Sequence, residues 1–201
     1  MNLPHNSYRR PIYDERIFDA DENGWRAHHD FLSAAKNTPD ALALNVEGVS
    51  YTYAQVRTAA EAIAEQIALS ETESTRSVVG VYVYRCLASY AGMLAAAMRG
   101  CTYVPLNPKF PEDRNATILE RSESSFLVHR TEDAAVAAKI INAAGTGATP
   151  ISCDLDMLAA GAKNPLPAPR HNSPHINFLF TSGSTGMPKG VMLRHSNLSA
   201  Y

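Results

Sequence analysis

The residues best suited to chemistry stand together in the run 180–190, which reads FTSGSTGMPKG. This run holds three glycines, four hydroxyl residues and one lysine. Glycines let backbone amides approach an anion closely, hydroxyl groups add hydrogen-bond donors, and lysine adds a mobile positive charge. The composition therefore indicates a loop that binds phosphate.

The flanking residues separate this loop from two familiar phosphate loops. Lys189 is followed by Gly190, so the glycine-lysine-hydroxyl triplet of GxxxxGK[ST] is absent, and the glycine spacing does not fit GxGxxG. Apolar residues lead in at 176–180 and follow at 191–193, which predicts a strand on each side and no helix dipole at the phosphate. The phosphate would then be held by backbone amides and by Ser182, Ser184, Thr185 and Lys189. A flexible Gly/Ser turn between two strands is the alternative, and the alternation of hydroxyls with glycines favours the phosphate loop.

The rest of the sequence predicts the elements that position this loop. Helical periodicity marks 25–35, 53–69, 87–98, 112–121 and 133–143, and apolar strand patterns mark 41–46, 49–52, 78–84, 101–106, 126–128 and 149–153. Thr52 and Gln55 have the spacing of a capping box at the start of the second helix. Alternating strands and helices indicate an α/β fold, a layered sheet with flanking helices. Residues 163–174 hold four prolines and are expected to form a connecting loop.

Composition narrows the class of protein. The chain has 201 residues, 45% of them hydrophobic and 19% charged, with a net charge of -2, which gives no electrostatic case for nucleic acid or an anionic membrane. No apolar stretch is long enough to cross a bilayer. Residues 1–24 are polar, lack the apolar core of a secretory signal and are expected to form a leader, so we expect a cytoplasmic protein. Three cysteines and seven histidines without ligand spacing predict reduced thiols and no metal site.

Two further side chains have alternative interpretations. His195 follows the predicted phosphate loop and either borders a substrate pocket or packs beneath the loop. Asp154 precedes a short helix, and capping of that helix is favoured over acid/base chemistry.

Four ordered segments together resemble the adenylate-forming enzyme superfamily, which contains acyl-CoA synthetases, luciferases and nonribosomal-peptide adenylation domains. They are VSYTYAQV at 49–56, MRGCTYVPLNPKFPEDR at 98–114, the glycine loop, and HSNL at 195–198. The second segment is similar to the amino-acid-activating branch. Residues 25–201 are thus identified as part of an AMP-binding (adenylation) domain, the first subdomain cut just after its phosphate loop.

The resemblance implies a reaction and a set of ligands. In such enzymes a carboxylate attacks the α-phosphate of Mg-ATP, and the acyl group then passes to a carrier-protein or CoA thiol. The cofactors implied are ATP and Mg²⁺, and the partners are an amino acid or other carboxylate, a carrier protein and the remaining C-terminal portion. The implied pyrophosphate-side residues are Thr181, Ser182, Gly183, Ser184, Thr185, Gly186 and Lys189. No catalytic residue is assigned, because the family's acyl pocket, ribose-binding aspartate and late lysine have no counterpart in these 201 residues.

The sequence also departs from the family and leaves alternatives open. Arg99-Gly100-Cys101 stands where the family has Ala-Gly-Gly, so Cys101 replaces a glycine. The isolated chain is expected to be inactive. A fragment of a fatty-acyl or aryl-CoA ligase is the second interpretation, and a non-catalytic docking or regulatory half-domain is the third.

Overall fold

The computed structural model describes residues 26–82, 84–182 and 188–199. Its α-helices are α1 (Ala27–Asn37), α2 (Tyr53–Ser70), α3 (Leu87–Met98), α4 (Glu112–Arg121), α5 (Ala134–Ala144), α6 (Leu155–Ala160) and α7 (Ser196–Ser199). Its strands are β1 (Leu42–Val46), β2 (Val49–Thr52), β3 (Val78–Tyr82), β4 (Thr102–Leu106), β5 (Phe126–Arg130), β6 (Thr149–Cys153), β7 (His175–Ser182) and β8 (Pro188–Arg194). A short 3₁₀ turn, Thr131–Asp133, separates β5 from α5.

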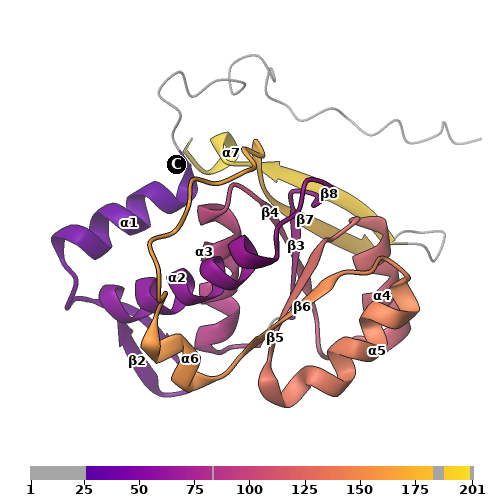
Figure 1. The fold of residues 1–201 in the computed structure, drawn as a ribbon, viewed down its shortest axis with the longest axis horizontal. Coiled ribbons are helices and arrows are strands. Elements are labelled where there is room, and N and C mark those ends of the chain that lie inside the picture. Colours follow the sequence, from indigo (N-terminus) through magenta and orange to yellow (C-terminus); the bar gives the residue numbers. More distant parts are fainter. Residues whose placement is uncertain (1–25, 83, 183–187, 200–201) are drawn as a thin grey trace, which may run out of the picture.

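A six-stranded sheet forms the centre of the molecule, with strand order β6-β5-β3-β4-β7-β8 (Figure 1). The first five strands of this order run parallel, and β8 pairs antiparallel with β7. Helices α2, α3 and α6 cover one face of the sheet, and α4 and α5 cover the other. The predicted α/β fold, a layered sheet with flanking helices, is confirmed.

Side chains alternate between two apolar cores because successive residues of a strand point to opposite faces. Val79, Val81 and Phe126 face α2 and α3, whereas Leu106 and Leu127 face α4 and α5. All five are at most 1% exposed. Burial of one such side chain stabilises the fold by about 1.5–3 kcal/mol.

The β1–β2 hairpin and the start of α2 form through local interactions. Glu47 and Gly48 make the turn, both with positive φ (51° and 80°), a conformation that hairpin turns require. Thr52 then caps α2, because its Oγ1 accepts from the Gln55 amide at 3.3 Å and the Gln55 side chain accepts from the Thr52 amide at 2.8 Å. The predicted capping box is confirmed, and α2 begins at Tyr53.

Residues 161–174 contain neither helix nor strand and cross from α6 to β7 on the α2 and α3 side. Glu65 of α2 holds the start of this segment by accepting from the amides of Lys163 and Asn164 at 2.9 and 2.8 Å. These hydrogen bonds, the one from the Lys163 amide first, lower the pKa of Glu65. At the other end the Ser173 amide donates to the Gly100 carbonyl at 2.9 Å. The segment is therefore fixed to the body at both ends.

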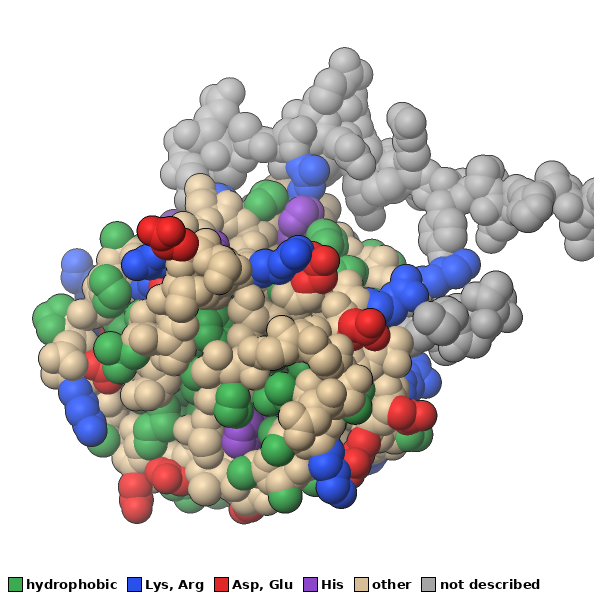
Figure 2. Space-filling view, turned by 45° about the vertical axis from the view of Figure 1, so that its right-hand side comes forward, with side chains coloured by type: hydrophobic (Ala, Val, Ile, Leu, Met, Phe, Trp, Pro, Cys, Tyr) green, Lys and Arg blue, Asp and Glu red, His purple; other side chains and the backbone are tan. Residues whose placement is uncertain are grey.

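Charged side chains of both signs are distributed over the visible surface. In the view of Figure 2, basic and acidic side chains are interspersed, with no large patch of one sign. No helix among the described residues is both long and apolar enough to cross a membrane.

Asp154 caps α6 as predicted, because its Oδ1 accepts from the Met157 amide at 2.7 Å.

Candidate functional site

The carboxyl ends of the five parallel strands meet at one edge of the sheet, and the segments that follow them lie there. Ligands of open α/β sheets bind outside this edge, where adjacent strands send their connections to opposite faces. Here β3 leads into α3 on one face, and its neighbour β5 leads into α5 on the other. The edge is thus the place at which to look for a site.

The predicted phosphate loop joins β7 to β8 at this edge. Backbone pairing continues to the last described pairs, Thr181 with Lys189 and Ser182 with Pro188. Both Thr181 and Lys189 are exposed, and the Thr181 Oγ1 donates to the Lys189 carbonyl at 3.4 Å. The structure therefore confirms a strand on each side of the loop.

The middle of the loop falls in a gap between the described ranges. Gly183, Ser184, Thr185 and Gly186 lie outside the described residues, and so do the side-chain surroundings of Ser182. Of the predicted phosphate ligands, the structure thus brings together Thr181 and Lys189, which pair at the two ends of the loop. The assignment of the full set stays a prediction.

Gly190 has a packing role that the sequence did not reveal. A Cβ atom at this position would lie 2.1 Å from Cε2 of Phe178, a separation that no side chain tolerates. Phe178 in turn packs on Phe180, with ring centroids 4.5 Å apart. Gly190 therefore lets an aromatic ring of β7 cross β8 at the base of the loop.

His195 fixes the end of β8 to the start of α1. Its side chain is 4% exposed, and its Nδ1 accepts from the Ala27 amide at 3.1 Å. Burial, followed by the positive charge of Arg26, lowers the pKa of His195 to about 4. The ring is therefore neutral at physiological pH, as an acceptor from an amide must be. His195 therefore has a packing contact with the start of α1, whereas the interpretation that it packs beneath the loop stays a prediction because 183–187 lie outside the described residues.

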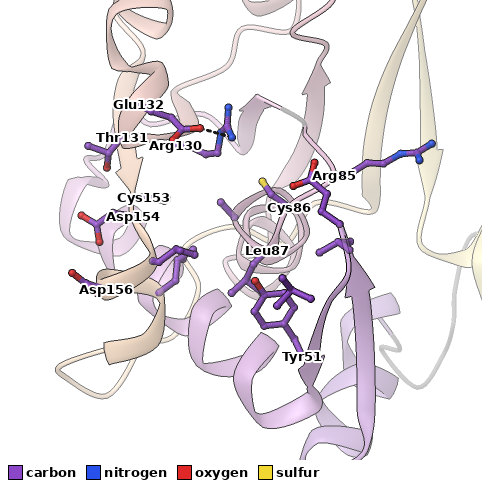
Figure 3. Close-up of a pocket in the computed structure, with 16 residues that line it drawn as sticks. Tyr51, Arg85, Cys86, Leu87, Arg130, Thr131, Glu132, Cys153, Asp154 and Asp156 are labelled. Atoms are coloured by element: carbon purple, nitrogen blue, oxygen red, sulfur yellow. Dashed lines mark ion pairs between the residues drawn. The ribbon is translucent and has the colours of Figure 1, made fainter.

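A cavity of about 460 Å³ lies at the same edge, between the β1–β2 hairpin and the ends of β3, β5 and β6 (Figure 3). Figure 3 shows the labelled side chains around it, with Arg85 extending away from the centre. Its lining residues are Val46, Glu47, Val49, Tyr51, Arg85, Cys86, Leu87, Ala88, Arg130, Thr131, Glu132, Cys153, Asp154, Leu155, Asp156 and Leu158. They come from four separate segments, so no local motif could have revealed the cavity.

Acidic side chains outnumber basic ones around this cavity, whose lining contains Glu47, Glu132, Asp154 and Asp156 but only Arg85 and Arg130 as cations. Arg130 forms ion pairs with Glu132 and with Asp133, the latter at 2.8 Å, and its guanidinium carbon lies 3.7 Å from the centre of the Tyr84 ring. Burial and the negative charge of Asp133 raise the pKa of Tyr84, so its hydroxyl stays protonated and donates to Asp133 Oδ1 at 3.2 Å. Because carboxylates predominate in its lining and Arg130 is already paired with Glu132 and Asp133, the cavity offers little attraction to a phosphate group.

Comparison with known proteins identifies the class. The family described as AMP-binding enzyme matches residues 31–201. The chain therefore belongs to the AMP-binding enzyme family.

Among curated relatives, the chain is 31% identical over 176 residues to a linear gramicidin synthase protein of Brevibacillus parabrevis, covering 85% of this chain and 2% of that protein. It is 32% identical over 168 residues to a surfactin synthase protein of Bacillus subtilis (strain 168), covering 84% of this chain and 13% of the relative. The chain thus spans a small fraction of the length of these relatives.

Solved structures show the same fold. A fatty acyl CoA synthetase of Mycobacterium tuberculosis matches with a TM-score of 0.69 at 24% identity, covering 88% of this chain and 36% of that one. The nonribosomal peptide synthetase FmoA3, bound to α-methyl-L-serine-AMP, matches with a TM-score of 0.69 at 21% identity, covering 87% and 18%. These matches establish the architecture of adenylate-forming enzymes.

Proposed function

We propose that this chain is the N-terminal part of an ATP-dependent enzyme that activates an amino acid through its carboxylate and passes it to a carrier-protein or CoA thiol. On this proposal, residues 25–201 form part of an adenylation domain, with residues 1–24 as a leader. The observation that supports the proposal is the pair of strands β7 and β8, whose ends at Ser182 and Pro188 flank the glycine loop at the carboxyl edge of the sheet, in a chain of this family.

The described ends of the loop fit a phosphate ligand. Thr181 supplies a hydroxyl and Lys189 an ammonium group, and both side chains are exposed at the edge where ligands of α/β sheets bind. We propose that Thr181, Ser182, Gly183, Ser184, Thr185, Gly186 and Lys189 surround the β- and γ-phosphates of ATP. ATP would supply the electrophilic α-phosphate, and Mg²⁺ would offset the phosphate charge. The chain's own part is to hold the leaving phosphates by charge and hydrogen bonds.

The amino-acid substrate is favoured by relatives of about 30% identity, one of which is named a dimodular nonribosomal peptide synthase, from Bacillus subtilis (strain 168), 29% identical over 175 residues. Two of these are the gramicidin and surfactin synthase proteins, and a third is the indigoidine synthase of Dickeya dadantii (strain 3937), 30% identical over 190 residues. The fatty acyl CoA synthetase is matched at 24% identity, which supports the architecture alone. An acyl- or aryl-CoA ligase is therefore the second candidate. A docking or regulatory half-domain is the third, and no described feature favours it.

Two measurements test the proposal. The first is binding of a fluorescent ATP analogue to the chain and to its Lys189→Ala and Thr185→Ala variants, with Lys139→Ala as the control for an exposed lysine of α5. We expect both loop variants to weaken binding about tenfold, which corresponds to loss of one charge-assisted hydrogen bond. Equal binding by all variants would show that the loop is a linker.

The second measurement is exchange of labelled pyrophosphate into ATP by the protein that contains this chain together with the rest of an adenylation domain. Exchange driven by amino acids would support the leading proposal. Exchange driven by fatty or aryl acids would favour the second candidate. We expect the 201-residue chain alone to give no exchange, and exchange by that chain would contradict the assignment as a part.

A further inference from the structure

Three side chains that can bind metal converge beneath the segment 161–174. Glu71 follows α2, Cys101 precedes β4, and His171 lies in the crossing segment. One ligand atom of each lies within 4.8 Å of the other two. No other group of three such side chains comes together in the part of the chain that the structure describes. We propose that Glu71, Cys101 and His171 bind a zinc ion that fastens the segment 161–174 to the body of the domain.

The ligand set determines the class of metal. Calcium and magnesium take oxygen ligands, whereas zinc accepts the combination of thiolate, imidazole and carboxylate. Three protein ligands of this kind leave a fourth tetrahedral position for water. Zinc, unlike iron or copper, does not change its oxidation state, so its binding requires no electron donor or acceptor.

An unsatisfied nitrogen provides an independent observation. The Nε2 atom of His171 is buried and has no hydrogen-bond partner. Buried polar atoms are almost always paired, and an unpaired one is costly. A bound metal, or a water held by it, would give this imidazole the partner that the protein alone does not supply.

Cys101 is inert as a free thiol in this environment. It is 1% exposed, and its Sγ donates only a long hydrogen bond, 3.7 Å, to the Arg99 carbonyl. Burial, followed by the negative charge of Glu71, raises the pKa of Cys101 to about 12. A coordinating thiol is deprotonated by the metal, so zinc binding would form one Zn–S bond and release one proton to solvent.

Glu71 can serve the metal while it stays paired with Arg99. The guanidinium of Arg99 donates to Oε2 of Glu71 at 2.6 Å and to Oε1 at 3.3 Å. A carboxylate has about four lone-pair positions, so it can bridge a guanidinium and a metal ion. The positive charge of Arg99 repels a cation, and we therefore expect this site to bind zinc more weakly than a structural zinc site with four protein ligands and no neighbouring cation.

The geometry requires a small adjustment of the three ligand side chains. Zinc bonds of about 2.0–2.3 Å place tetrahedral ligand atoms roughly 3.3–3.8 Å apart, whereas these three atoms lie within 4.8 Å of one another, so each separation would shorten by at most about 1.5 Å. The backbone at His171 packs closely on Gly100, so the shift would come from rotation of the His171 side chain. His171 also lines a cavity of about 220 Å³, whose lining residues include Met98, Gly100 and Pro169 but not Glu71 or Cys101.

The chain contains a matched control for the thiol. Cys153 is 2% exposed, donates to the Ile151 carbonyl at 3.7 Å, and has a pKa raised to about 12 by burial, as Cys101 has. It differs in belonging to no group of three potential ligands among the described residues. His175, at the start of β7, serves as the control for His171.

The experiment is titration of the reduced 201-residue chain with Zn²⁺ by calorimetry and with Co²⁺ by absorbance. We expect one ion per chain and a thiolate-to-Co²⁺ charge-transfer band. Cys101→Ser and His171→Gln should each weaken binding at least about 100-fold, and the band should disappear in Cys101→Ser. Cys153→Ser and His175→Gln should behave as the unmodified chain.

A second readout does not depend on equal stability of the variants. The melting temperature of each variant is compared with and without Zn²⁺, and we expect a rise in the unmodified chain and in Cys153→Ser but none in Cys101→Ser or Cys101→Ala. Absence of binding, a Co²⁺ band that survives Cys101→Ser, or equal weakening by the control variants would overturn the proposal. Because none of these measurements involves ATP, they stand apart from the test of the adenylation function.

Discussion

The ion pair between Arg99 and Glu71 yields a prediction whose magnitude follows from its burial. Both side chains are 1% exposed, and Arg99 also donates from Nη1 to the Pro167 carbonyl at 2.7 Å. A buried pair contributes little relative to apolar side chains of the same volume, but removing one partner leaves the other charge buried without compensation. The cost of breaking the pair should therefore far exceed its net contribution.

The perturbation is Arg99→Met in buffer containing a chelator, so that a metal at Glu71 has no influence. We expect the free energy of unfolding to fall by about 3–5 kcal/mol, a large part of the roughly 5–15 kcal/mol typical of a domain. For a chain of this length that loss lowers the melting temperature by roughly 6–20 °C. Arg99→Met combined with Glu71→Leu should recover most of the loss, because the uncompensated charge is gone.

The assay is urea denaturation followed by far-ultraviolet circular dichroism, with the slope of the transition checked for constancy. Arg57→Ala provides the control, since Arg57 pairs with Glu61 at 2.7 Å but its side chain is 44% exposed. An exposed helical pair of this kind contributes about 0.3–0.5 kcal/mol. A loss below about 1 kcal/mol for Arg99→Met, or a double variant no more stable than the single one, would refute the reasoning.

Three further outcomes are expected. Thr52→Ala should remove the cap of α2 and lower the free energy of unfolding by about 1 kcal/mol, and an unchanged urea midpoint would show that the cap does not stabilise the domain. Gly100→Ala should destabilise the domain more than Gly145→Ala, although both glycines have positive φ (67° and 64°). A Cβ atom at Gly100 would lie 2.0 Å from the His171 carbonyl oxygen, whereas a Cβ atom at Gly145 would have nothing within 4 Å. Equal urea midpoints for the two variants would contradict this. Burial lowers the pKa of His28 and of His195 to about 4, below the unfolded value of 6.5, so the unfolded chain binds more protons than the folded one between these pH values. The free energy of unfolding, measured by urea titration, should therefore fall as the pH drops from about 7 to 5, by on the order of 1–2 kcal/mol per histidine. A His195→Gln variant should show a smaller fall.

Features that depend on neighbours in the sequence were predictable. The bounds of α3 and α4 agree with the predicted 87–98 and 112–121, because apolar periodicity and the flanking Gly and Pro residues mark their ends. The capping box at Thr52 and the strand after the glycine loop were likewise predictable, since each depends on residues only a few positions apart in the sequence. Some boundaries differ: β3 is described over Val78–Tyr82 within the predicted 78–84, where residue 83 lies outside the described residues, and α1 ends at Asn37, two residues beyond the predicted end at 35.

In the sequence alone, the alternation of strand and helix patterns indicated the class of the fold and the glycine loop indicated the kind of ligand to look for, because periodicity and donor chemistry depend on residues that are close along the chain. Only the tertiary structure decided that Arg99 is fully buried against Glu71, that His195 accepts from the start of α1, and that Cys101 meets the distant His171. No spacing rule relates such residues, since their separation is set by the strand order and by the path of the segment 161–174 across the sheet. Burial and charge compensation are properties of that packing, and they convert three scattered side chains into a candidate site.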